Sequence, residues 1–379
     1  MSTKPQKPQK TPQWTAQRVA ALTLTAAWQL GARSLNRIRE RFPDLAAFIR
    51  TPNAWRTIPL QEAQRAALAR VSHQKIQEII QTLAAQHIQF VLPQEATFPQ
   101  RLTRMEDPPF ALFIRGAPVQ PDVIHIAMVG TRRITREGTR ATTFLAGELA
   151  HAGITVVSGF ALGADIAAHT GCVNAGGRTI GVLPSGIDDA SIAPRAHLRF
   201  AHNILAKQCG TLLSEYPPGT PIRKFQFLVR NRLVAALAHA VVITEGDHDS
   251  GALVTARLAL ENGQEVLAVP GSIFLPTARG TNQLIADGAR PCRNLQDILA
   301  VLGMESAQHA AQINTARSTI PMSPAETALL QALQTPHTID ELSRALKIPA
   351  SDISATMSLL ELKGRIISVG PRTYIQNTI

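Results

Sequence analysis

Residues 240–256 read AVVITEGDHDSGALVTA, and this stretch contains the transition from strand to helix that decides the fold. The apolar run predicts a strand that ends at Thr244, and a helix is expected from Gly251, with Ser250 placed to cap its first turn. An apolar run without alternation is typical of a strand covered on both faces. Such a strand, followed by a short loop and a helix, is typical of an α/β sheet, where helix amides can meet phosphate groups.

The same unit recurs along the chain. Strands are predicted near 124–129, 155–157, 179–183, 211–214 and 265–269, and helices near 137–151, 163–175, 197–209, 228–238 and 251–262. Because strands and helices alternate, the sequence predicts an α/β fold with a Rossmann-like, doubly wound, mostly parallel sheet over residues 122–300.

The flanking segments have a different character. Residues 1–12 are predicted to be a disordered tail, and residues 13–92 a small helical domain of the SAM-like or helix-hairpin-helix-like kind. Within it, the segment from Leu30 to Ile38 reads either as a helix-hairpin-helix turn or as part of an ordinary bundle with a solvated basic face. Six prolines between 93 and 121 favour an extended connector, and residues 301–322 read as a linker.

Residues 323–379 predict a winged helix, since three helices precede two short strands. Thr338 and Glu341 are spaced as a capping box. The third helix is predicted over 350–363, and the segment from Pro349 to Met357 has no Arg, Lys, Asn or Gln with which to read bases. We therefore expect this domain to contact protein more than DNA bases, although a transcriptional regulator that works through it remains a third hypothesis for the chain.

Charge and composition restrict the partners. The formal net charge is +11, and residues 1–121 carry 16 Lys and Arg against 7 Asp and Glu, which suggests a polyanionic partner. The three cysteines form no CxxC pair, so neither a disulfide framework nor a zinc site is expected, and a cytoplasmic protein is the simplest interpretation. No leader and no membrane-spanning run are expected.

Candidate binding residues follow the predicted strands and begin the predicted helices. Small residues there allow close backbone approach, and cations beside phenylalanines suit phosphates and bases. The candidates are Gly130, Arg132, Ser158, Gly159, Gly163, Lys224, Phe227, Arg230, Asn231, Arg232, Ser250 and Gly251. Each has an ordinary structural alternative, as a strand-to-helix turn, a core phenylalanine, a solvated cation or a helix cap.

Catalytic signatures are missing from the sequence. There is no Gly-Lys dipeptide, which excludes a P-loop, and no GxSxG or HExxH motif. Glu245, Asp247 and Asp249 could hold magnesium, but three acids on one loop more often cap and solvate it. His169 has no second ligand at metal spacing. We therefore expect no catalytic residue, no metal and no cofactor.

Taken together, ordered motifs over about residues 93–293 resemble the DNA-processing protein A family, also called DprA or Smf. They include Val129-Gly130-Thr131-Arg132, Ser158-Gly159 with Gly163 and Asp165, Gly181-Val182-Leu183, Leu213-Ser214-Glu215-Tyr216-Pro217-Pro218-Gly219-Thr220, Arg230-Asn231-Arg232, Val269-Pro270-Gly271 and Gly280-Thr281-Asn282.

The resemblance implies a non-catalytic, dimeric binder of single-stranded DNA that protects incoming DNA and loads the RecA recombinase during natural transformation. It places phosphate contacts at Gly130, Arg132, Ser158, Gly159 and Lys224, with Phe227, Arg230 and Asn231 completing the pocket. The chain departs from the family pattern at Thr131, at Leu228, over residues 189–194 and at Phe160, which is expected to narrow the second loop. The alternative function is a nucleotide or phosphoribosyl hydrolase on a related sheet.

Overall fold

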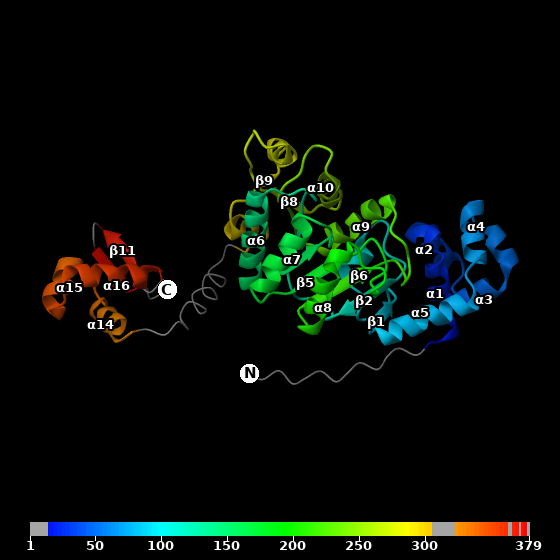
Figure 1. Cartoon of the computed structure of the whole chain (residues 1–379), viewed down its shortest axis with the longest axis horizontal. Coiled ribbons are helices and arrows are strands. Elements are labelled where there is room, and N and C mark those ends of the chain that lie inside the picture. Colours follow the sequence, from blue (N-terminus) through cyan, green and yellow to red (C-terminus); the bar gives the residue numbers. More distant parts are fainter. Residues whose placement is uncertain (1–13, 305–322, 363–365, 371–372, 377–379) are drawn as a thin grey trace. The chain divides into compact units, whose positions relative to one another are not determined.

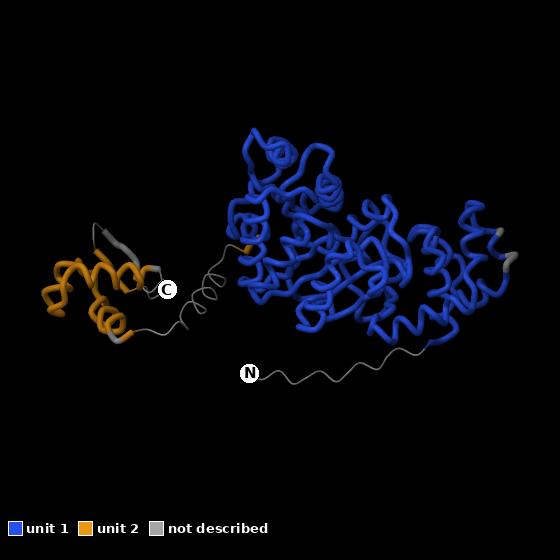
Figure 2. Tube along the Cα trace, viewed as in Figure 1, with its two compact units in different colours: residues 1–302 blue, residues 303–379 orange. Residues whose placement is uncertain are grey.

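The computed structural model describes residues 14–304, 323–362, 366–370 and 373–376. The chain divides into two compact units, residues 1–302 and 303–379 (Figure 2). The predicted disordered tail at 1–12 and most of the predicted linker at 301–322 lie outside the described residues. The other domain boundaries drawn from the sequence stay predictions.

The first unit begins with helices. They are α1 (Ala16–Ala26), the 3-10 helix η1 (Trp28–Leu30), α2 (Gly31–Arg41), α3 (Leu45–Arg50), η2 (Pro52–Thr57), α4 (Glu62–Ala69) and α5 (His73–Ala85). Their apolar faces bury Leu22, Leu24 and Ile38 in one core. The segment from Leu30 to Ile38 lies almost wholly within α2, and its only break is Gly31, whose φ is +69°.

A nine-stranded sheet follows, in the order β1-β2-β6-β5-β4-β3-β7-β8-β9. Figure 1 shows β1, β2 and β6 toward one end of this sheet and β8 and β9 toward the other. The seven strands from β6 to β9 in this order are parallel. They are β3 (His125–Val129), β4 (Thr155–Ser158), β5 (Thr179–Val182), β6 (Gly210–Ser214), β7 (Ala240–Ile243), β8 (Glu265–Ala268) and β9 (Arg290–Pro291). All residues of β3 to β7 are buried, which explains their unbroken apolar runs.

The helices between these strands are α6 (Arg136–His151), α7 (Ala164–Asn174), η4 (Arg195–His197), α8 (Leu198–Ala206), α9 (Lys224–Leu237), α10 (Gly251–Glu261), η5 (Pro276–Ala278) and α11 (Arg279–Ala286), and α12 (Leu295–Val301) follows β9. Helices α9 and α10 share an apolar core with one face of the sheet, which includes Ala127, Val157 and Val241. Because parallel crossovers are right-handed, the connections from β3 to β6 place their helices on the opposite face. The predicted doubly wound α/β fold is confirmed.

The strand order reverses direction at β3. From β3 the chain proceeds through β4 and β5 to β6, then returns to β7 on the other side of β3. The loops that leave β3 and β7 therefore diverge toward helices on opposite faces. A crevice forms at such a switch point, outside the carboxyl ends of the strands, and this is where ligands bind in sheets of this type.

The segment from 93 to 121, predicted to be an extended connector, also contributes to the sheet. It contains η3 (Gln100–Arg104) and β2 (Leu112–Gly116), which pairs antiparallel with β6 and with β1 (Ile88–Val91). The prolines that suggested a connector stand outside β2, so they do not interrupt its hydrogen bonds.

The second unit forms α14 (Pro324–Ala332), β10 (His337–Thr338), α15 (Ile339–Leu346), α16 (Ala350–Leu362), β11 (Ile366–Gly370) and β12 (Thr373–Gln376), with the strand order β10-β12-β11. The capping box is confirmed, since Thr338 accepts from the amide of Glu341 and the Glu341 carboxylate accepts from the amide of Thr338. The core contains Leu342, Ile353 and Leu360. The predicted winged-helix fold is confirmed.

Candidate functional site

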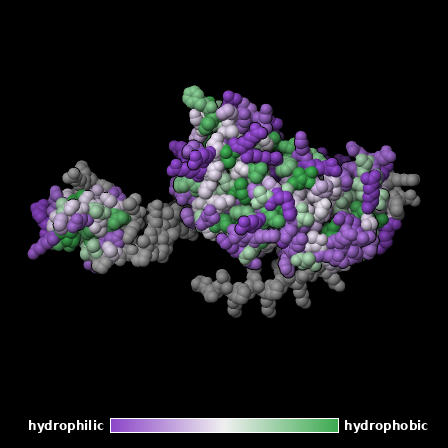
Figure 3. Space-filling model, in the orientation of Figure 1, coloured by the Kyte–Doolittle hydropathy of each residue, from purple (hydrophilic) through white to green (hydrophobic). Residues whose placement is uncertain are grey.

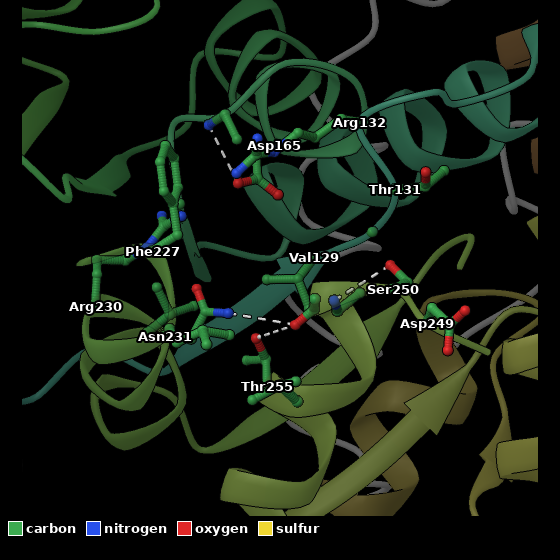
Figure 4. A pocket seen from close by; sticks show the side chains of 18 of the residues that line it. Val129, Thr131, Arg132, Asp165, Phe227, Arg230, Asn231, Asp249, Ser250 and Thr255 are labelled. Carbon is green, nitrogen blue, oxygen red and sulfur yellow. Dashed lines mark hydrogen bonds between the residues drawn. The ribbon is translucent and has the colours of Figure 1, made fainter. Parts of the chain in front are cut away.

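A pocket of about 600 Å³ opens at the switch point of the sheet (Figure 4). Four segments form its walls: the loop after β3, the loop after β4 with the start of α7, the first half of α9, and the start of α10. Nine of the twelve residues predicted from the sequence line it: Gly130, Arg132, Gly159, Lys224, Phe227, Arg230, Asn231, Ser250 and Gly251.

The accessible part of the pocket includes three cations and one aromatic ring. Arg132, Arg133 and Lys224 are exposed, and the guanidinium of Arg132 lies 4.3 Å from the centroid of the Phe227 ring. This cation–π contact holds Arg132 toward the pocket rather than toward solvent. The ring of Phe227 is partly accessible, so charge and an aromatic face are offered side by side.

Deeper in the pocket, two opposite charges converge on Gly159. A Cβ atom on Gly159 would lie 1.7 Å from Nη1 of Arg230 and 2.5 Å from Oδ2 of Asp165. Arg230 is only 4% exposed, and its Nη1 donates to the Val182 carbonyl at 2.8 Å. Burial lowers the pKa of the Arg230 guanidinium to about 10, although Asp165 opposes the shift.

The Asp165 carboxylate accepts a hydrogen bond from the amide of Ala161 at 3.2 Å. Burial raises the pKa of Asp165, while the neighbouring Arg230 opposes the rise. Each buried charge therefore offsets part of the cost of burying the other. Three exposed cations, Arg132, Arg133 and Lys224, face an incoming ligand against one exposed carboxylate, that of Asp249.

Helices α9 and α10 are joined at the pocket by polar side chains. Nδ2 of Asn231 donates to the carbonyl of Gly251 at 3.3 Å, and Oγ1 of Thr255 donates to the same carbonyl at 3.4 Å. The predicted cap is confirmed, since the Ser250 hydroxyl accepts from the amide of Ala252. The positive end of the α10 dipole therefore faces the pocket.

Three predicted residues do not line the pocket. The Ser158 hydroxyl is buried and donates to the Met128 carbonyl at 2.6 Å. Gly163 has a φ of +79° and packs against the backbone of Thr131 and Arg132, so it shapes the loop after β3. Both residues support the backbone beside the pocket, and the contacts with DNA predicted for them stay predictions.

Arg232 is directed elsewhere. Its Nη2 lies 2.5 Å from both carboxylate oxygens of Glu215, and its Nη1 donates to the Asp107 carbonyl at 2.6 Å. Residues 230 and 232 are about 200° apart around a helix, so one faces the pocket and the other cannot. The structure therefore places Arg232 in an ion pair, in place of the predicted DNA contact.

We expected Phe160 to narrow the loop after β4, but its ring does not line the pocket. Its side chain is fully buried, and its ring packs beside the rings of His169, His197 and Phe200. The backbone at Phe160 has a φ of +60°, which turns the ring away from the loop. His169 is thus a core histidine, and burial lowers its pKa to about 3.

The acidic residues of the turn after β7 lie in different environments. Glu245 is buried and accepts from the amide of Thr135 at 3.0 Å, whereas Asp249 lines the pocket. Among the described residues no cluster of three His, Cys, Asp or Glu could hold a metal ion. Within the same part of the chain, no helix has the length and hydropathy needed to cross a membrane.

Sequence reasoning missed Asp165 as a pocket residue and gave Thr131, Arg133 and Thr255 no committed role. The signal for Asp165 was present, since an acid among the small apolar residues Ala164, Ala167 and Ala168 of a buried helix needs a partner.

A Rossmann-like core with a cationic pocket at its switch point, together with a winged helix, defines an anion-binding protein of the nucleic-acid-handling kind. Residues 89–303 match the family model of DNA recombination-mediator protein A, and residues 314–370 match the DprA winged helix domain. The chain belongs to this family, DprA/Smf.

Relatives support the assignment. The chain is 35% identical over 257 residues to DNA processing protein DprA of Bacillus subtilis, and the alignment covers 67% of this chain and 85% of that protein. It is 37% identical over 210 residues to Protein Smf of Escherichia coli, of which it spans 55%, and the same alignment covers 55% of this chain.

Two solved structures agree with the fold. DNA processing protein A from Streptococcus pneumoniae is 25% identical, with a TM-score of 0.62, and the match covers 76% of this chain and 98% of that chain. The protein from Helicobacter pylori, described with a unique single-stranded DNA binding mode, is 33% identical, with a TM-score of 0.51 over 57% of this chain and 97% of that chain.

Proposed function

We propose that this protein binds single-stranded DNA in the pocket at the switch point, without catalysis. The observation that carries the proposal is the Arg132–Phe227 pair beside Lys224 in a pocket of about 600 Å³. Cations that follow a phosphate backbone, next to a ring on which any base can stack, form the usual binding surface for single strands. The described binding mode of the Helicobacter pylori relative supports the same ligand.

A non-catalytic role is part of the proposal. The pocket contains two carboxylates, of which Asp165 is buried near the opposite charge of Arg230 and Asp249 lies on an exposed loop. Neither is paired with a second acid as a hydrolase of glycosidic bonds would require. Release of free base from nucleoside monophosphates by the purified protein would instead support the alternative function, a nucleotide or phosphoribosyl hydrolase.

The proposal extends to a cytoplasmic homodimer that protects incoming DNA and loads RecA in natural transformation. Protein partners need a contact surface, and Ile273 and Phe274 are 78% and 88% exposed. They belong to the loop between β8 and α11, and Figure 3 shows hydrophobic atoms projecting at the tip of this loop. Adjacent apolar side chains at such exposure favour a protein contact.

The central experiment measures binding of fluorescent oligothymidylate and of a duplex of equal length by anisotropy at several salt concentrations. We expect preference for the single strand, and Arg132→Ala and Lys224→Ala should each weaken binding and reduce the salt slope by roughly 0.7. The matched controls are Arg178→Ala and Lys207→Ala, because both residues are exposed and precede β5 and β6 at the opposite edge of the sheet. Equal affinity for both DNA forms, unchanged in the two pocket variants, would contradict the proposal.

A further inference from the structure

A second, smaller pocket lies where the helical segment meets α9, within the same compact unit. Its volume is about 120 Å³. Trp28 and Gly31 line it from η1 and α2, and Phe225 and Val229 line it from α9. Helices α2 and α9 lie side by side there (Figure 1).

Two aromatic rings meet at this pocket. The rings of Trp28 and Phe225 are within 21° of parallel, with centroids 6.4 Å apart. Phe225 nevertheless stays 49% exposed. Rings that served only to join the two segments would be expected to be buried, because exposure forfeits the hydrophobic contribution of an aromatic side chain.

Positive charge accompanies the rings. The guanidinium of Arg223 lies 5.6 Å from the centroid of the Trp28 ring. Arg33 on α2 keeps 67% of its side chain exposed, although its Nε lies 3.9 Å from a carboxylate oxygen of Asp107. The one carboxylate in the pocket wall, that of Glu215, is paired with Arg232 at 2.5 Å. The pocket therefore presents apolar ring faces with the Arg223 cation beside one of them, which suits a polyanion with aromatic bases.

The first turns of α9 connect the two pockets. Lys224 and Phe227 face the larger pocket, while Phe225 and Val229 face the smaller one. Successive helix residues point about 100° apart, so neighbouring residues 224 and 225 serve different pockets. A strand that leaves the larger pocket past Lys224 can reach Phe225 across the N-terminus of a single helix.

We propose that Trp28 and Phe225 form a base-stacking subsite that binds the continuation of the strand held in the switch-point pocket. This inference rests on the proposed single-strand function. Stacking tolerates any base, since every base offers a π-face. The helical segment thereby gains a direct role in binding DNA, with Arg223 near the phosphates that connect the two subsites.

The test compares oligothymidylates of increasing length by anisotropy. We expect wild-type affinity to rise once the strand is long enough to reach the second subsite, and Phe225→Ala should lose roughly tenfold of that gain, as for one stacked base. Phe225→Trp should retain the gain. The matched control is Phe144→Ala, because Phe144 is 57% exposed on α6 and lines neither pocket.

A direct readout accompanies the affinities. With Trp14 and Trp55 replaced by phenylalanine, we expect long but not short strands to quench Trp28, and 5-iodouracil oligomers to crosslink at Trp28 or Phe225. If Phe225→Ala keeps the full length gain and Trp28 is neither quenched nor crosslinked, this subsite is wrong. Failure of Arg132→Ala and Lys224→Ala to weaken any strand would instead contradict the proposed function itself.

Discussion

The two edges of the parallel sheet use similar polar side chains for different purposes. At the carboxyl edge, the donors of Arg132 and Lys224 face a pocket. At the amino edge, Nη2 of Arg101 donates to the Ala238 carbonyl at 2.6 Å, and Nε2 of Gln264 donates to the same carbonyl, also at 2.6 Å.

Helix direction explains the difference. Helices that follow parallel strands end at the amino edge, so their last carbonyls gather there and accept bonds from nearby cations. Their first amides gather at the carboxyl edge, where cations and amides add to one positive field. The same kind of cation is therefore occupied at one edge and available to a ligand at the other.

Asp165→Asn gives the largest expected effect at the carboxyl edge. It leaves the buried Arg230 guanidinium without its counter-charge, which costs about 3–5 kcal/mol of unfolding free energy. Urea unfolding measures the loss, and the exposed Asp122→Asn near the amino edge should change it by less than about 0.5 kcal/mol. Equal losses in both variants would remove the distinction between the edges.

Acid should destabilise the amino edge through His125. Burial lowers the pKa of His125 from 6.5 to about 4, so the unfolded chain binds more protons between these two values. Stability is complete above pH 6.5 and falls as the pH drops toward 4, by about 3 kcal/mol for this group. Unfolding at pH 7.5 and pH 4 should show a smaller difference in His125→Asn, and an unchanged difference would refute the assignment.

Alanine substitutions at Gly159 and Gly177 distinguish an effect on packing from an effect on DNA binding. A Cβ on Gly159 would collide with Arg230, and one on Gly177 would lie 2.4 Å from Cβ of Ala150 and 2.8 Å from Sγ of Cys172. Each alanine variant should lose about 1–3 kcal/mol of stability. Only Gly159→Ala should also weaken binding of single-stranded DNA, measured by anisotropy at a temperature where both variants are folded.

The smallest expected effect compares two helix caps. Ser250 caps α10 at the pocket, and Ser72 caps α5 in the helical segment. Alanine at either position should cost about 1 kcal/mol of stability. We expect Ser250→Ala alone to reduce DNA affinity, by a few-fold, because the cap orients the first amides of α10. Indistinguishable affinities would mean that Ser250 serves only the helix.

Much of the core could be predicted because its signals are local. The apolar runs of β3 to β8 and the caps at Ser250 and Thr338 depend on nearby residues. Strands β1 and β2 were missed, because their pairing joins residues distant in the chain and prolines flank β2. Boundaries also shifted, since α9 begins at Lys224, four residues before the predicted start at 228.

The residues of the site likewise divide into those that a local pattern predicts and those that depend on distant parts of the chain. The sequence named nine of the pocket residues, because small residues and cations after strands are a local pattern. It could not separate Arg230 from Arg232, nor find the stack of Trp28 on Phe225, which joins residues nearly 200 positions apart. The separation of the two arginines and the stacking of the two rings both depend on which part of the fold packs against each face of a helix.

The sequence by itself determined the doubly wound core, the winged helix and the family, because hydrophobic periodicity and ordered motifs are properties of the chain alone. Tertiary structure decided which cations are available to a ligand. Arg232 is taken by Glu215, Arg230 is buried opposite Asp165, and Arg132 rests on Phe227 at the mouth of the pocket. The physical reason is that a charge is neutralised or left free by its neighbours in space, and folding alone brings those neighbours together.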